Sequence, residues 1–304
     1  MQHAPLYTVI IPHCNTPELL QRCLASIPDT DAIQVIVVDD NSSADIVDFT
    51  RFPGCERKHT QVIFCKESRG AGHARNLALP QAQGEWLIFA DADDYFTPDA
   101  WSTIAAFANH PADIVYLSIR SVDSDTGLTL HDRGDEFIKD LHNYLLTKDR
   151  EWECRLRFWS VMPWGKMIRR QTVEQHAIRF SETLYSNDVL FCTRLALLAQ
   201  RIEATETVCY CVTRHSGSLT QTKSLEAIRT RYEINLQKNL LLRRHGYRRY
   251  EANVLMFMRL LMRFGAKGLW TFIRLSCTYR ASLLPSWHWM RTIRRENKAQ
   301  QQTR

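Results

Sequence analysis

The chain of 304 residues lacks several patterns that would place it in other classes of protein. It has nine cysteines but no Cys-X-X-Cys pair, and this usage fits a reducing compartment better than a disulfide framework. No uncharged apolar run reaches about 18 residues, so no transmembrane helix is expected. The N-terminus shows no basic stretch followed by a long apolar core, so no signal peptide is expected either.

Two nucleotide-binding signatures are also missing. No Gly-X-Gly-X-X-Gly follows the first predicted strand, which removes the main support for a dinucleotide-binding Rossmann fold. Gly70-Ala71-Gly72 opens a predicted helix but lacks the Lys-Ser/Thr of a phosphate loop. These glycines indicate either close helix packing or a loop that brings Arg75 to a phosphate, a role that suits the planar donors of a guanidinium group.

Basic residues are concentrated near the end of the chain. With 45% apolar and 24% charged residues it is an ordinary globular sequence, without a repeat or a low-complexity linker. Residues 243–304 contain 14 basic and two acidic residues, whereas the rest contains 25 basic and 31 acidic residues. We therefore expect a catalytic domain over 1–222, with halves at 1–115 and 116–222, and a basic helical region over 223–304.

Apolar runs at 7–11, 34–38, 62–65 and 86–90 predict strands, and a further strand is predicted over 161–169. Helical spacing predicts a helix after residue 16 and a second one after residue 69 that runs to Gln83. This alternation predicts an α/β fold with a mostly parallel central sheet flanked by helices. Ligands bind such sheets at the carboxyl ends of the strands. Three polar segments follow three of these strands and should meet in one crevice: Pro12-His13-Cys14-Asn15, Asp39-Asp40 and Asp91-Ala92-Asp93.

The buried run Trp86–Ala90 ends abruptly in Asp91, Asp93 and Asp94. Carboxylates gathered at the end of a buried strand repel one another and lose hydration, so they need compensation. A divalent cation, Mn²⁺ or Mg²⁺, would supply it, because these ions prefer oxygen ligands and leave positions open for phosphate oxygens. The alternative is a solvated acidic turn that caps the following helix.

The order and spacing of four segments resemble the family 2 glycosyltransferases of the GT-A fold, in particular those that build bacterial surface polysaccharides. The segments are Val9–Asn15, Ile36–Ser42, Gly72–Asn76 and Asp91–Asp94. Looser matches extend the likeness to about residue 220: Pro163–Arg170, Phe180–Phe191, and Tyr210 with Arg214 and Ser218-Leu219-Thr220.

The resemblance implies a nucleotide-sugar donor, most commonly with uracil as its base, bound over the strand ends. Asp40 matches the position that hydrogen-bonds the base, Asp93 matches the metal ligand, and Asp91 matches a contact to ribose or metal. The expected donor-binding set is Pro12, His13, Asn15, Asp40, Arg75, Asp91 and Asp93. For His13 an ordinary polar loop role is the alternative.

Asp188 matches the general base that takes the proton from the acceptor hydroxyl, which implies inversion at the anomeric carbon. Without the resemblance, Asp188 would be an acid at a helix N-terminus, favoured by the helix dipole. Two residues depart from the family pattern. Cys14 replaces the Tyr that often stacks on the base, and Asn187 replaces the Glu that usually precedes the general base.

The basic region mixes arginines with large apolar residues. In one continuous helix, Arg259, Arg263, Lys267 and Arg274 would fall within about 80° of arc. Together with Trp270, Trp287 and Trp289, this pattern predicts peripheral association with the anionic cytoplasmic membrane face, where a lipid-linked acceptor would lie. The alternative is a helical pair packed on the domain with Arg outward. We expect no nucleic-acid partner, because the basic residues share their faces with bulky apolar ones.

The sequence thus predicts a cytoplasmic, metal-dependent, inverting sugar transferase that elongates a cell-surface glycan, such as a lipopolysaccharide or capsule precursor. One rival is a phosphatase with an Asp-X-Asp nucleophile, although that motif normally follows the first strand and here follows the fourth. Another rival is a degenerate, membrane-bound scaffold protein without activity, which Cys14 and Asn187 make conceivable.

Overall fold

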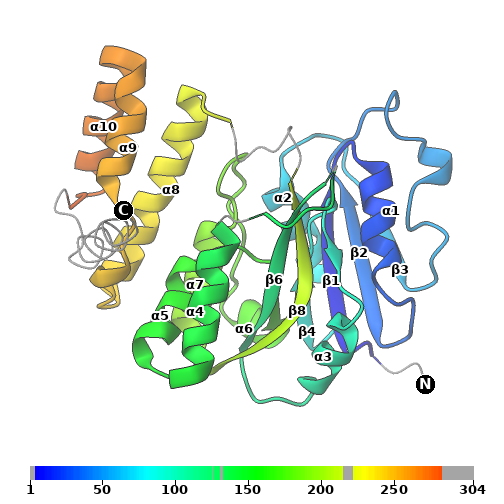
Figure 1. Cartoon of the computed structure of the whole chain (residues 1–304). Helices are drawn as coiled ribbons and strands as arrows, with labels where there is room; N and C mark the ends of the chain where they lie inside the picture. Colours follow the sequence, from blue (N-terminus) through cyan, green and yellow to red (C-terminus); the bar gives the residue numbers. More distant parts are fainter. Residues whose placement is uncertain (1–3, 125, 131–132, 215–221, 283–304) are drawn as a thin grey trace. The chain divides into compact units, whose positions relative to one another are not determined.

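A computed structural model describes residues 4–124, 126–130, 133–214 and 222–282 (Figure 1). The chain forms two compact units, residues 1–218 and 219–304. Within the described ranges, none of the helices has both the length and the apolar character that crossing a bilayer requires. The tail residues Trp287 and Trp289 and the segment Ser218–Thr220 lie outside the described residues.

An eight-stranded sheet runs through the first unit in the order β3-β2-β1-β4-β7-β6-β8-β5. Only β7 and β5 run antiparallel to their neighbours among these strands. The predicted, mostly parallel sheet is therefore confirmed. The strands are β1 (Tyr7–His13), β2 (Ile33–Asp39), β3 (Thr60–Phe64), β4 (Trp86–Phe89), β5 (Tyr95–Phe96), β6 (Ile114–Asp123), β7 (Lys166–Arg169) and β8 (Ile202–Arg214).

Helices flank this sheet (Figure 1). They are α1 (Pro17–Ala25), α2 (Ala71–Ala78), α3 (Ala100–Ala106), α4 (Arg133–Thr147), α5 (Arg150–Trp159), α6 (Arg170–Gln175) and α7 (Val189–Leu198). Every residue of β1 and β4 is buried. Cover on both faces explains why these strands appear in the sequence as unbroken apolar runs instead of alternating ones.

Proline and glycine shorten two of the predicted elements. The helix expected to run to Gln83 ends at Ala78, and Pro80 lies in the 3₁₀ turn that follows (Leu79–Gln81). Proline has no backbone N–H to donate the next i→i−4 hydrogen bond, so the α-helix does not continue through residue 80. The strand expected over 161–169 is confined to Lys166–Arg169. Gly165, with φ +65°, turns the chain immediately before it.

The second unit contains three helices in its described part, α8 (Leu225–Arg244), α9 (Val254–Leu261) and α10 (Gly265–Thr278). Their apolar faces pack around Tyr232, whose ring stacks on Phe272 at 5.4 Å. A 3₁₀ turn (Met262–Phe264) separates α9 from α10, so Arg259 and Arg274 lie on two helices and not on one. Gly268 lies inside α10 where a Cβ would be 1.8 Å from the Leu261 carbonyl oxygen, so glycine allows close packing here.

Candidate active site

The carboxyl ends of β1, β2 and β4 lie at one edge of the sheet. His13 pairs with Asp39 at the ends of β1 and β2, and Ile10 pairs with Phe89 at the end of β4. The backbone N–H of Ala90 then donates to the Ile10 carbonyl at 3.1 Å. The segments after these three strands, residues 14–16, 40–43 and 90–94, are therefore neighbours at the edge where α/β sheets bind ligands.

A buried histidine joins β1 to β2. His13 Nδ1 lies 2.8 Å from Asp39 Oδ1, and His13 Nε2 accepts the backbone N–H of Thr16 at 3.1 Å. An accepting Nε2 carries no proton, so the proton belongs on Nδ1 and is donated to Asp39. Desolvation raises the pKa of Asp39, but hydrogen bonds from His13 and Ser42 outweigh it and leave the pKa below its ordinary value. Both ring nitrogens of His13 are thus engaged inside the chain.

Asn15 and Asp40 tie adjacent loops together. Asn15 has a left-handed φ of 57°, its backbone N–H donates to Ser42 Oγ and its side-chain oxygen accepts the Ser43 N–H, each at 2.8 Å. Asp40 accepts the hydroxyl of Ser68 and the backbone N–H groups of residues 69 and 70 at 2.8–2.9 Å. The Asp40 carboxylate thereby holds the segment that leads into α2. Asp40 Oδ1 accepts one of these bonds and has the capacity for a second.

Asp91, Asp93 and Asp94 form an acidic cluster directly after β4. One oxygen from each carboxylate lies within 4.8 Å of the others. Burial raises the pKa of Asp94 well above its usual range, and the charges of Asp93 and Asp91 raise it further. Three carboxylate oxygens this close together are a donor set that fits a divalent cation with oxygen ligands. Asp91 and Asp93 are partly exposed whereas Asp94 is buried, so the carboxylates of Asp91 and Asp93 are more accessible to a ligand.

Arg75 of α2 connects the acidic cluster to the segment before α7. Its Nη2 donates to Asp91 Oδ1 at 2.5 Å and its Nη1 donates to Asn187 Oδ1 at 3.0 Å. The guanidinium group is buried and lies 5.3 Å from the Phe180 ring centroid. The guanidinium group of Arg75 therefore bonds two different segments of the chain, and α2 holds Asp91 close to residue 187.

Asp188 immediately precedes the first residue of α7 and is half-buried. Burial raises its pKa, although the positive charge of Arg75 lowers it. The segment before it is packed tightly on α2, because a Cβ at Gly72 would lie 2.2 Å from the Ser181 carbonyl oxygen and 2.8 Å from the Asn187 Cβ. Arg75 and Gly72 thus bring Asp188 to the same edge as Asp91.

Two residues that the sequence analysis did not single out also reach the acidic loop. Arg22 of α1 and Thr213 of β8 both donate a hydrogen bond to the backbone carbonyl of Asp93. They lie 71 and 120 positions away in the chain, and neither belongs to a recognisable motif. No local sequence pattern could have identified them.

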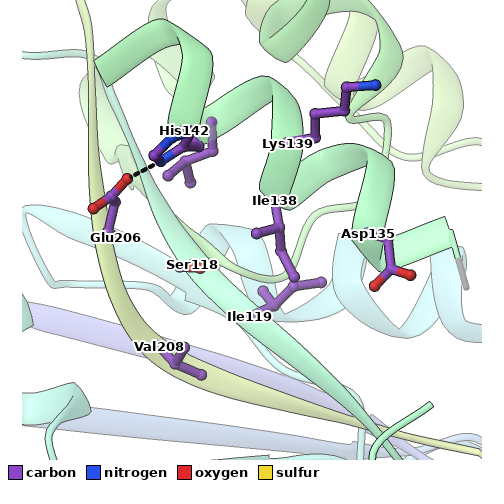
Figure 2. Close-up of a pocket in the computed structure, with 9 residues that line it drawn as sticks. Ser118, Ile119, Asp135, Ile138, Lys139, His142, Glu206 and Val208 are labelled. Atoms are coloured by element: carbon purple, nitrogen blue, oxygen red, sulfur yellow. Dashed lines mark hydrogen bonds and ion pairs between the residues drawn. The ribbon is translucent and has the colours of Figure 1, made fainter. Parts of the chain in front are cut away.

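The described residues also form a pocket of about 470 Å³ between α4 and the strands β6 and β8 (Figure 2). Its lining includes Ile138 of α4 and Ile119 and Val208 of the strands, and a hydrogen bond joins His142 to Glu206 at one end. None of the predicted site residues lines this pocket. The acidic strand edge, where titratable groups converge, is therefore the better candidate for the active site.

Comparison with known proteins finds a family match over the part of the chain that contains this edge of the sheet. The family described as glycosyl transferase family 2 matches residues 8–176, which include β1, β2 and the acidic loop. A putative glycosyltransferase of Bacillus subtilis, EpsH, is 27% identical over 246 residues, which cover 77% of this chain and 70% of EpsH.

Two solved structures share the fold. Residues 1–349 of TarS from S. aureus, crystallised with UDP-GlcNAc, superpose with a TM-score of 0.57 at 21% identity and cover 90% of this chain and 91% of that one. The mannosyltransferase PcManGT from Pyrobaculum calidifontis, in complex with GDP-Man and Mn²⁺, gives a TM-score of 0.57 at 19% identity, with 95% and 79% covered. The predicted GT-A fold is thereby confirmed.

Proposed function

The chain belongs to glycosyl transferase family 2, and from that premise we propose that it transfers a sugar from a nucleotide-sugar, with inversion, to a glycan or lipid-linked acceptor in cell-surface polysaccharide synthesis. One observation supports this proposal above the others: α2 connects three acidic segments at a single edge of the sheet. The residue before α2 donates to Asp40, and Arg75 of α2 donates both to Asp91 of the acidic cluster and to Asn187, next to Asp188. A lipopolysaccharide or capsule precursor is the acceptor class we favour.

The donor lies over the ends of β1 and β2 in this proposal. Asp40 keeps one acceptor position for an N–H of the base, and uracil is the base that we favour because a structural neighbour binds UDP-GlcNAc. Pro12 and Asn15 border that position, whereas His13 acts through Asp39, because its ring nitrogens are engaged. Arg75 acts on the donor through Asp91, which it orients, or at the diphosphate itself.

Asp91 and Asp93 would hold Mn²⁺ or Mg²⁺, which, when bound, neutralises the negative charge of the diphosphate leaving group. Asp188 takes the proton of the acceptor hydroxyl as the acceptor oxygen attacks the anomeric carbon. The new bond joins that oxygen to the anomeric carbon, and the bond from this carbon to the diphosphate breaks on the opposite face. The nucleoside diphosphate leaves with the bonding electrons, and the configuration inverts.

A screen of nucleotide-sugars with and without Mn²⁺ tests the proposal, because a true donor stabilises the folded protein by mass action. We expect one donor to raise the melting temperature only when the metal is present, and chelation to abolish the effect. Calorimetry that detects no metal-dependent binding of any nucleotide-sugar would instead support a scaffold protein. Release of inorganic phosphate without sugar transfer would support a phosphatase.

Replacing Cys14 by Tyr is expected to tighten donor binding. Cys14 is exposed beside Asp40, and the family often has a Tyr there that stacks on the base. A stacked ring adds about 0.5–1.5 kcal/mol, so the KM for the donor should fall roughly 2- to 12-fold with little change in kcat. Steady-state kinetics measure this. Cys55→Tyr, at another exposed cysteine, is the control, and an unchanged KM in Cys14→Tyr would remove position 14 from the base site.

We also propose that the protein associates peripherally with a membrane. In the described part of the second unit, the exposed surface of α10 supports this proposal. Leu269, Trp270 and Ile273 are 44%, 65% and 45% exposed, and at about 100° per residue they lie within about 100° of arc. Lys267 and Arg274 are exposed on the adjoining 60° or so. An apolar stripe with basic residues on its flank suits insertion at an anionic membrane surface.

Introducing a charge into this stripe should release the protein from membranes. Ile273→Glu is expected to lower binding to phosphatidylglycerol-containing vesicles about tenfold or more, because about 1.5 kcal/mol of apolar burial is lost. Sedimentation with vesicles measures the effect. Leu146→Glu, at a 69% exposed leucine of α4, is the matched control. Equal sedimentation of both variants would favour the alternative of a packed helical pair.

A further inference from the structure

We propose that strand β8 positions the acidic loop for metal binding, and that Thr213 and Tyr210 are the positioning residues. The inference rests on the proposed function, since it concerns the cation that Asp91 and Asp93 would hold. Neither residue is a candidate ligand. Together they act on the backbone and on the buried member of the acidic cluster, from a strand that lies about 120 positions further along the chain.

Three hydrogen bonds join β8 to the acidic loop. The hydroxyl of Tyr210 accepts the backbone N–H of Asp91 at 2.9 Å. The backbone N–H of Thr213 donates to Asp94 Oδ1 at 2.7 Å, and the Thr213 hydroxyl donates to the backbone carbonyl of Asp93. Residues 91, 93 and 94 are thus each bonded to the same strand, and this strand limits how the loop can move.

The Tyr210 hydroxyl is itself held firmly in place. The Tyr210 ring is fully buried, stacks on Trp164 with centroids 5.8 Å apart, and meets the edge of Phe96 at 5.3 Å. Strand β8 is paired with β6 on one side and with β5 on the other. Because β5 begins at Tyr95, the residue after Asp94, both ends of the acidic loop are anchored in the sheet.

Arg22 determines the direction of the Thr213 hydroxyl. The Arg22 Nη2 donates to Thr213 Oγ1 at 3.4 Å and also to the Asp93 carbonyl. Since Thr213 Oγ1 accepts from Arg22, its own proton is available for the Asp93 carbonyl. Two donors therefore converge on this one carbonyl and fix the peptide between Asp93 and Asp94. The orientation of that peptide sets where the Asp93 carboxylate points.

Such support matters because metal affinity depends on where the ligands are held. Mg²⁺ demands nearly octahedral geometry, and residues that orient the ligands typically change metal affinity 10- to 100-fold when they are replaced. A loop released from β8 would retain its carboxylates but sample more positions. The expected defect is weaker metal binding that excess metal overcomes, in contrast to the loss of a ligand.

The test replaces Thr213 by Val, which removes the hydroxyl at nearly constant size, and by Ser, which retains it. Loss of one hydrogen bond to the Asp93 carbonyl should weaken Mn²⁺ binding roughly five- to tenfold, with kcat at saturating Mn²⁺ within about twofold of the parent. Electron paramagnetic resonance of free Mn²⁺ reports binding to the metal alone, and turnover against Mn²⁺ concentration reports it a second time. Thr213→Ser should bind like the parent protein.

Thr207→Val, at an exposed threonine of the same strand, is the matched control and should bind Mn²⁺ like the parent. Tyr210→Phe, which removes the hydrogen bond to the Asp91 N–H, should also weaken Mn²⁺ binding. It provides a second test of the inference if Thr213→Val fails to fold. Unchanged Mn²⁺ affinity in a folded Thr213→Val or Tyr210→Phe protein overturns the inference, as does a loss of turnover that excess Mn²⁺ does not restore. A parent protein that neither binds Mn²⁺ nor transfers sugar contradicts the proposed function itself.

Discussion

Replacing Asp188 by Asn is expected to lower the rate of sugar transfer by about 10²–10⁴-fold, the usual contribution of a general base. The amide retains the size of the side chain but cannot accept the acceptor proton as a carboxylate does. Asp188 lies before α7 at the edge that Arg75 shares with Asp91, so its loss should spare the donor site. Donor affinity measured by calorimetry should stay within about twofold of the parent value, while kcat measured by product formation falls.

The alternative role of Asp188, as an acid favoured by the helix dipole, predicts a different result. Asp99 offers a matched control, because it occupies the same position before α3, with φ −84° against −82° for Asp188, and makes no side-chain capping bond. A purely structural Asp188 would make both Asn variants lose a similar fraction of a kcal/mol in stability, with transfer intact. Normal turnover in Asp188→Asn would falsify its assignment as the base.

Replacing Asp93 by Asn is expected to abolish metal-dependent donor binding as well as turnover. Asn retains an oxygen but removes one negative charge from the cluster formed with Asp91 and Asp94. Electrostatic stabilisation of a diphosphate by a cation is worth several kcal/mol, so turnover should fall by about 10³-fold or more. The shift in melting temperature that Mn²⁺ and donor produce together should disappear.

Asp45→Asn is the control for the loss of charge, because Asp45 is an exposed carboxylate in the segment after β2. It should leave both the melting-temperature shift and turnover near the parent values. If Asp93→Asn retains the Mn²⁺-dependent shift, the acidic cluster is a solvated turn, which is the alternative that the sequence left open. The Asp93 and Asp188 variants together separate donor binding from chemistry, since only the first should lose both.

The strand ends and their polar residues could be predicted from the sequence because each depends on a short stretch of chain. A five-residue apolar run such as Trp86–Ala90 is short for a helix and typical of a strand covered on both faces, and the carboxylates after it then lie at the strand's carboxyl end. The parallel pairing of β1 with β2 follows from the helix α1 that connects them, and β4 pairs with β1 in the same direction after the helix α2. The resemblance added roles for Asp40, Asp93 and Asp188, and those roles stay predictions until the variants are measured.

The positions of the supporting groups could not be predicted, because they arise from contacts between distant segments. Arg75 looked like a phosphate ligand from its place in a helix, yet in the fold it donates to Asp91 and to Asn187, 16 and 112 positions away. His13 lies in the expected segment, but pairing of β1 with β2 commits its ring to Asp39. Neither contact has a local pattern, since each depends on which strands become neighbours.

The sequence by itself therefore determined that this protein is an α/β chain with acidic residues at its strand ends and a basic helical extension. Periodicity and burial are encoded locally, which is why they can be recognised without a structure. Only the tertiary structure decided which groups hold those acids: Arg22 and Thr213 reach the Asp93 carbonyl across 71 and 120 positions. A hydrogen bond between distant segments depends on sheet order and packing, and these are properties of the whole fold.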